Sequence, residues 1–291
     1  MNYEQFMECV RTRVEEVLGG EARVTVYSVV KNNSVKLDGL TIMERENNVS
    51  PTIYLNPYFE AFEHGMEMDK IVREILKVYT QCRPKQKFDT DYLKDYEKVK
   101  DRIVYRLVNY EKNRELLEQM PCIRFLDLAV IFYCLIAVGE EGTASVAVKS
   151  EYRKVWDITL PQIYEQAKIN TPKLLPYVLQ TMLEVLGELC DGMDTSGAVP
   201  MYVLTNQLRM NGAACILYPD VLRECSRKIG GDLLILPSSI HEVILMPDHG
   251  NGNRAELREM VEEINQTQLE AEEVLSGQVY RYERNTNKII L

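Results

Sequence analysis

The polar residues best suited to chemistry lie in one segment, Leu233 to His249, with the sequence LLILPSSIHEVILMPDH. Two of the three histidines of the chain lie there, eight residues apart. Imidazole nitrogens and carboxylates are metal ligands, and a serine beside a histidine can act as a nucleophile. The segment therefore predicts a site of one of two kinds. A hydrolytic site would use Ser238, Ser239, His241 and Glu242, and a metal site would use His241, Asp248 and His249.

The spacing of the two histidines argues against a single metal centre. In a continuous strand, eight residues span about 26 Å at about 3.3 Å per residue. Two ligands of one zinc ion each lie only about 2 Å from the metal. The segment also lacks the GxSxG motif of serine hydrolases and the HExxH motif of zinc proteases. We therefore favour a structural interpretation, in which two strands flank a turn at Pro237 and His241 bonds a loop carbonyl.

Other polar residues are weaker candidates. His64 follows the run NPYFEAFE, where it is expected to cap the C-terminal end of a helix, because a cation interacts favourably with that end of the dipole. The loop 206–212, NQLRMNG, carries Arg209 between two apolar runs, a common position for a ligand-binding loop. The sequence contains no GxGxxG motif and no phosphate-binding P-loop motif, so no cofactor is expected.

The charges of the chain are strongly uneven around a formal net charge of −10. Residues 83–114 hold ten Lys or Arg against six Asp or Glu, whereas residues 248–273 hold two against eight. Two solvated faces of opposite sign are the simpler interpretation. The alternative is a docking pair, in a homo-oligomer or with a protein partner. Tyrosines interleave with the cations of 83–114, as in single-strand binders, but an acidic protein repels phosphate backbones, so nucleic acid ranks lowest as a partner.

Cysteine usage and apolar runs predict a cytoplasmic protein. The seven cysteines are widely spaced and form no CxxC motif, which is typical of reduced, buried thiols. The N-terminus carries acidic residues through its apolar positions, unlike a signal peptide. The most apolar run, 125–138, is shorter than the roughly 20 residues of a membrane-spanning helix. No membrane association is therefore expected.

Hydrophobic periodicity predicts strand pairs interleaved with helices. Helices are expected at 3–18, 56–64, 68–79, 112–119, 151–157, 159–167, 175–189, 221–229 and from 254. Strands are expected at 22–30, 35–43, 51–55, 102–110, 125–138, 144–148, 233–236 and 242–246, with 201–206 paired to 213–218 and a terminal hairpin over 278–291. Because hairpins outnumber βαβ crossovers, the fold class is α+β with mainly antiparallel or mixed sheets. We place the two lobes at 1–120 and 121–291, or a single unit over 1–291.

Three runs of the sequence carry a family resemblance: NGAACILYPDVLRECSRKIGGDLLILPSSIHEVILMPD, IRFLDLAVIFY and VWDITLPQIYEQAKINT. Together they resemble a family of uncharacterised bacterial proteins from gut-dwelling clostridia, known only as a domain of unknown function. The similarity spans nearly the whole chain. It implies a bacterial, cytoplasmic origin and brings with it no catalytic or binding residues.

Two functions follow from these patterns. The favoured one is a non-enzymatic binding or regulatory module, since no motif selects a reaction and the charges are segregated. The alternative is a small hydrolase, metal-assisted or not, built on residues 237–249. Nucleic-acid binding through 83–114 ranks third.

Overall fold

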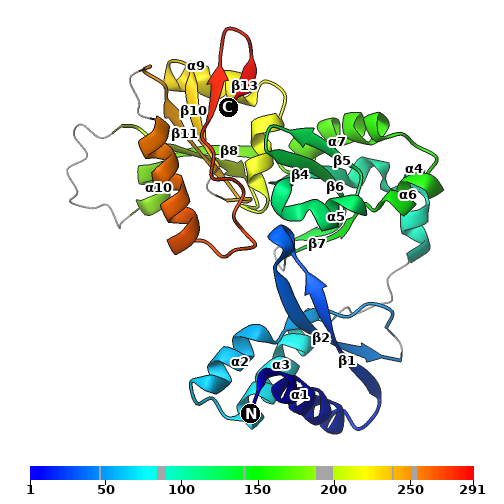
Figure 1. Cartoon of the computed structure of the whole chain (residues 1–291). Coiled ribbons are helices and arrows are strands. Elements are labelled where there is room, and N and C mark those ends of the chain that lie inside the picture. Colours follow the sequence, from blue (N-terminus) through cyan, green and yellow to red (C-terminus); the bar gives the residue numbers. More distant parts are fainter. Residues whose placement is uncertain (46, 84–89, 140–141, 188–198, 238, 251–253) are drawn as a thin grey trace. The chain divides into compact units, whose positions relative to one another are not determined.

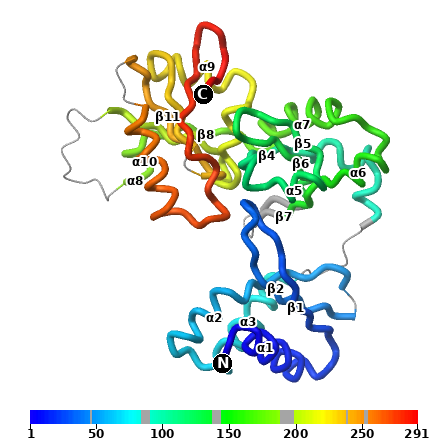
Figure 2. The backbone as a smooth tube through the Cα atoms, in the orientation of Figure 1, coloured from blue at the N-terminus to red at the C-terminus, as the bar shows by residue number. Residues whose placement is uncertain are grey.

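The structure is a computed structural model that describes residues 1–45, 47–83, 90–139, 142–187, 199–237, 239–250 and 254–291. Its internal contacts divide the chain into two compact units, and Figures 1 and 2 follow the chain through both. Unit 1 comprises Met1–Lys31 and Val35–Asp91, and unit 2 comprises Asn32–Ser34 and Tyr92–Leu291. The lobes 1–120 and 121–291 stay a prediction.

Unit 1 is a three-stranded antiparallel sheet with helices packed on one face. Its strands lie in the order β1 (Ala22–Val30), β2 (Lys36–Glu44) and β3 (Thr52–Tyr54), and its helices are α1 (Tyr3–Val17), α2 (Asn56–Glu63) and α3 (Met68–Cys82). A capping box between Asn2 and Gln5 begins α1, and the buried face of that helix recurs at helical spacing through Phe6 and Val10. These side chains pack on alternate strand residues such as Leu40.

The first sheet of unit 2 is built around a long central strand, as predicted, but this strand begins at Leu128 and not at Phe125, because residues 126 and 127 form a turn. The strands are β4 (Ile103–Asn109), β5 (Cys122–Phe125), β6 (Leu128–Gly139) and β7 (Gly142–Ala147), and β6 pairs antiparallel with the other three. Helices α4 (Tyr96–Val99), α5 (Arg114–Glu118), α6 (Ser150–Val155) and α7 (Leu160–Leu174) belong to this part of unit 2. Helix α7 packs against β4. The side chains of α5 pack on Val108 of β4 and Ile131 of β6.

The second sheet of unit 2 holds six antiparallel strands in the order β13-β12-β10-β11-β9-β8. Their bounds are β8 (Tyr177–Thr181), β9 (Tyr202–Asn206), β10 (Leu233–Leu236), β11 (Val243–Pro247), β12 (Tyr280–Glu283) and β13 (Lys288–Ile290), with helices α8 (Met182–Leu186), α9 (Val221–Ile229) and α10 (Arg254–Thr267). Leu234 and Met246 face α10, and α9 packs against β11. Strand β10 is buried along its whole length, which explains its unbroken apolar sequence.

The predicted α+β fold class is confirmed, because the described residues form three antiparallel sheets with packed helices. None of the helices described is long and apolar enough to cross a lipid bilayer.

The helix predicted over 175–189 is wrong. Residues 177–181 form β8, which pairs with β9, and the α-helix described in this range covers 182–186, whereas 188 and 189 lie outside the described residues. Thr181 accepts a hydrogen bond from the amide of Glu184, and the Glu184 carboxylate accepts one from the amide of Thr181. This capping box fixes the start of α8, and its Thr-x-x-Glu spacing was a usable signal in the sequence.

The strand predicted over 213–218 is also wrong. Both edges of β9 are already paired, with β8 on one side and β11 on the other. Residues Gly212–Leu217 instead form a 3-10 helix, η6, that packs against β9. The apolar run is buried against the sheet rather than within it.

The buried thiols predict a loss of stability in alkaline solution. Burial raises the pKa of Cys134 and of Cys225 to about 11, whereas an unfolded thiol titrates near a pKa of about 8.5. A raised pKa stabilises the fold fully below about pH 8.5, and this stabilisation is lost as pH rises toward 11. The free energy of unfolding, measured with urea in the presence of a reductant, should fall by about 2 kcal/mol per thiol between about pH 8.5 and about pH 10.5. The pH slope should become shallower in Cys134→Ala/Cys225→Ala, and an unchanged slope would contradict this origin.

Candidate functional site

The segment Leu233–His249 forms two paired strands and the connection between them. Leu234 of β10 pairs with Met246 of β11, so the chain folds back between residues 237 and 242. His241 lies before β11 and His249 lies after it. At about 3.3 Å per residue, the five residues of β11 hold the two histidines about 16 Å apart or more. The structure does not bring together the two histidines of the predicted metal site.

Both ring nitrogens of His241 have neighbours within the fold. Nδ1 accepts a hydrogen bond from the backbone amide of Asn211 at 3.3 Å. Nε2 lies 3.5 Å from Oε1 of Glu273. The His241 side chain is half-buried, and the Glu273 side chain is more exposed. Because Nδ1 accepts from an amide, the ring proton lies on Nε2 and faces the carboxylate. A histidine in this state carries no unoccupied nitrogen for a nucleophile or a metal.

Ser239 is used by the connection itself. Its hydroxyl accepts a hydrogen bond from the amide of His241 at 3.0 Å, and the residue is only 3 % exposed. Thr205 on β9 donates to the His241 carbonyl at 2.7 Å. Glu242 is half-buried beside this turn, and Ser238 lies outside the described residues. Among the interactions described, the Ser239 hydroxyl bonds the backbone of His241 and not its ring, so Ser239 and His241 do not form a nucleophile–base pair.

Gly212 permits this arrangement. A Cβ at this position would lie 2.2 Å from Oγ1 of Thr205 and 2.5 Å from the carbonyl oxygen of His241. Only a glycine lets the start of η6 approach β9 and the connection so closely. In the sequence, the pair Asn211-Gly212 indicated a turn. It gave no sign that Asn211 would bond His241.

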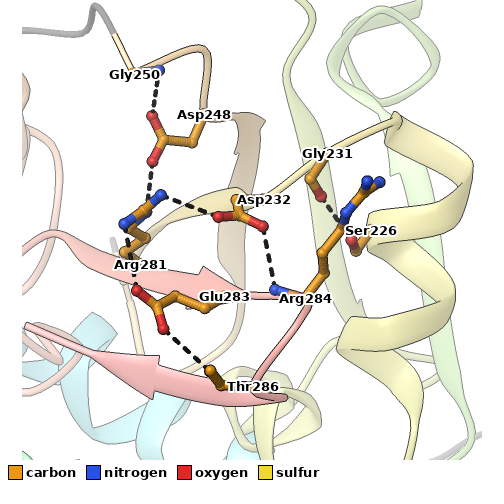
Figure 3. Close-up of polar contacts among 9 residues, drawn as sticks. All are labelled: Ser226, Gly231, Asp232, Asp248, Gly250, Arg281, Glu283, Arg284 and Thr286. Atoms are coloured by element: carbon orange, nitrogen blue, oxygen red, sulfur yellow. Dashed lines mark hydrogen bonds and ion pairs between the residues drawn. The ribbon is translucent and has the colours of Figure 1, made fainter.

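The other end of β11 carries a cluster of charges around Arg281, drawn in Figure 3. The Arg281 guanidinium lies 2.9 Å from Asp232, 2.8 Å from Asp248 and 3.3 Å from Glu283, measured between the closest N and O atoms. The Asp248 side chain is the most buried of the three, at 9 % exposure. Asp232 also accepts from the backbone amide of Arg284, whose side chain extends away from Arg281. One cation therefore holds three carboxylates from the ends of β10, β11 and β12.

Sequence reasoning missed three of these four residues. Asp248 was predicted as a metal ligand, yet its neighbour is a guanidinium. Asp232 and Glu283 lie 16 and 35 residues away from it along the chain. The alternation of β12 does place Arg281 and Glu283 on one face, which was the only local signal. His249 is exposed just beyond the cluster. Among the described residues, no group of three or more His, Cys, Asp or Glu side chains could hold a metal ion.

The remaining polar candidates have local roles. His64 is the C-cap of α2, and its Nδ1 lies 2.7 Å from the carbonyl of Glu60, as predicted for a helix end. In the basic stretch 83–114, Lys98 pairs with Asp95, Lys100 with Glu97 and Arg114 with Glu111. These three acids belong to the same stretch, so the pairs leave its excess of positive charge unchanged, whereas Arg83 pairs with Glu44 outside the stretch.

A family model described as a family of unknown function, DUF5688, matches residues 3–284. The chain belongs to DUF5688. The match covers both units and both ends of β11, in agreement with the whole-chain resemblance inferred from the sequence. No curated protein and no solved structure matches the chain. Membership of DUF5688 therefore establishes the family and assigns no activity.

Proposed function

We propose that this DUF5688 protein is a cytoplasmic bacterial binding or regulatory module without catalytic activity, which associates with a second copy of itself through surface charge. The observation that carries the proposal is the outer face of α10. The six described cysteines are free thiols, as expected of a reducing compartment.

Helix α10 presents an acidic surface, which we define as Glu259, Glu263 and Glu270 at the end of the following turn. Val261 is buried against the sheet, whereas these three glutamates are exposed. Among the described residues, Arg258 pairs with Glu262, and no cation pairs with a member of the acidic surface. Repulsion between these carboxylates is relieved when a basic surface covers them.

The polar groups at the two ends of β11 support binding rather than catalysis. His241, Ser239 and Asp248 each have a partner that stabilises the fold. A catalytic role would require His241 to release Asn211 or to leave Glu273. The hydrolase therefore remains the alternative prediction.

Charge reversal on α10 tests the proposal. In Glu259→Lys/Glu263→Lys the self-association constant should fall about tenfold, because two attractive contacts become repulsive. Sedimentation velocity at about 50 mM and about 500 mM salt measures the self-association constant. The higher salt concentration should weaken the self-association of the wild-type protein, because salt screens the charges. Glu4→Lys/Glu16→Lys on α1 is the matched control, since it changes the charge equally at two exposed glutamates. A strictly monomeric wild type at low salt would contradict the proposal.

A further inference from the structure

Arg106 on β4 lies across one face of the first sheet of unit 2 without a carboxylate. The carbon of its guanidinium lies 3.0 Å from the centroid of the Tyr133 ring on β6. Its Nη2 donates a hydrogen bond to Oγ of Ser145 on β7 at 3.1 Å. Among the described residues, no Asp or Glu forms an ion pair with Arg106. The side chain thus spans three strands and is held by a ring and a hydroxyl.

The surroundings of Arg106 are apolar. On one side of Tyr133, Val104 and Leu135 pack with Leu175. On the other side, Val108 and Ile131 pack with helix α5. Arg106 is half-buried between these clusters, and burial lowers its pKa below the ordinary value of an arginine. Proteins normally pair a desolvated charge, because an unpaired one is costly.

Other arginines of unit 2 have evident structural partners. Arg281 holds three carboxylates, and Arg102 donates to the carbonyls of Leu135 and Ile136. Arg124 donates to the carbonyl of Leu126 and lies 4.6 Å from the Tyr110 ring. Arg106 differs from Arg281 because its one described acceptor is a hydroxyl, which brings no negative charge, and it differs from Arg102 and Arg124 because that acceptor is not a backbone carbonyl.

The geometry leaves Arg106 ready to receive an anion. A guanidinium has five N–H donors in a planar fork, and stacking on Tyr133 occupies only one of its faces. The Ser145 hydroxyl accepts from Nη2, so its own proton is available to a further acceptor. Ser145 is exposed, which opens this end of the guanidinium to solvent. Stacking also fixes the fork in advance, which lowers the entropy cost of binding.

We propose that Arg106, Tyr133 and Ser145 form a binding site for the oxyanion group of a small molecule, a carboxylate or a phosphate. The fork of Arg106 donates two parallel hydrogen bonds to two oxygens of the anion, and the Ser145 hydroxyl donates to one of them. The Tyr133 ring stacks on the guanidinium and holds it in one orientation. The net charge of −10 disfavours long polyanions and favours a small ligand. This site is separate from the acidic surface on α10.

Titration with sodium acetate and with inorganic phosphate, each at constant ionic strength in sodium chloride, tests the site. NMR spectra of ¹⁵N-labelled protein should show saturable shifts at Arg106 and Ser145 with at least one probe. Saturation with acetate alone identifies a carboxylate ligand, and saturation with phosphate alone identifies a phosphate ligand. Saturation with neither probe overturns the proposal.

Three variants separate the site from general charge attraction. Arg106→Lys keeps the charge and loses the fork, so affinity should fall about tenfold, and Arg106→Met should show no saturable shift. Ser145→Ala, at an exposed position, should weaken binding about threefold to tenfold. Arg124→Met is the matched control, because it removes a second tyrosine-stacked arginine of the same sheet. Wild-type affinity in Arg106→Met, or an equal loss in Arg124→Met, would overturn the proposal.

Discussion

Replacing Gly212 by alanine should destabilise unit 2 by about 3 kcal/mol, through overpacking against atoms that cannot move aside. The new Cβ would lie 2.2 Å from Oγ1 of Thr205, 2.5 Å from the carbonyl oxygen of His241 and 2.7 Å from the amide nitrogen of Asn206. Two of these atoms are backbone, and β9 is fixed between β8 and β11. Relief of the clash requires η6 to shift, which would also separate Asn211 from His241. Urea unfolding measures the loss.

The chain provides a matched control for this substitution. Gly231 follows α9, and a Cβ there would meet no atom within 4 Å. Gly231→Ala should therefore be neutral, or stabilise by about 0.5 kcal/mol by restricting the unfolded chain. Equal stabilities of the two variants would refute the close approach of η6 to β9.

Replacing Arg281 by methionine should destabilise unit 2 by about 2 kcal/mol. The substitution leaves Asp232, Asp248 and Glu283 close together without their cation, and Asp248 is nearly buried. Removing one partner of a buried ion pair costs about 3 to 5 kcal/mol. We expect less here, because the other two carboxylates are 24 % and 28 % exposed and solvent screens them. Urea unfolding near neutral pH gives the value.

Two further variants locate the cause in uncompensated charge. Arg284→Met removes a nearby arginine, but Asp232 bonds only the backbone amide of that residue, so stability should change by less than about 0.5 kcal/mol. Adding Asp248→Asn to Arg281→Met removes one uncompensated charge and should recover about half of the loss. A double variant no more stable than Arg281→Met alone would exclude repulsion as the cause.

Much of the fold follows from local patterns in the sequence. The hairpin of β1 and β2, the long strand β6, the pair β10–β11 and the terminal hairpin each lie close to where apolar runs, alternation and turn residues predict them. Asn33 illustrates the reason, because its φ of 58° is a left-handed conformation that asparagine tolerates better than most residues. Thr159 likewise begins α7 through a capping box with Gln162. Such signals act over three or four residues, so they survive in the sequence alone.

The two wrong elements failed for a nonlocal reason. Apolar residues at 175–189 fit helical spacing, and those at 213–218 fit a strand, so periodicity alone could not reject either. The partners of β9 decided both cases. Pairing with β8 made residues 177–181 extended, and the completed sheet left no edge for 213–218.

The sequence by itself determined the fold class, the family and the separation of the two histidines, since these depend on short-range spacing or on the whole chain. The tertiary structure alone decided the partners of the polar side chains at His241, Arg281 and Arg106. Glu273 faces His241, Asp232 and Glu283 surround Arg281, and Arg106 crosses from β4 to Ser145 on β7. Each pairing joins residues 32 or more positions apart, except Arg281 with Glu283. Electrostatic contacts depend on distance in space, which sheet order and register set and which sequence spacing does not encode.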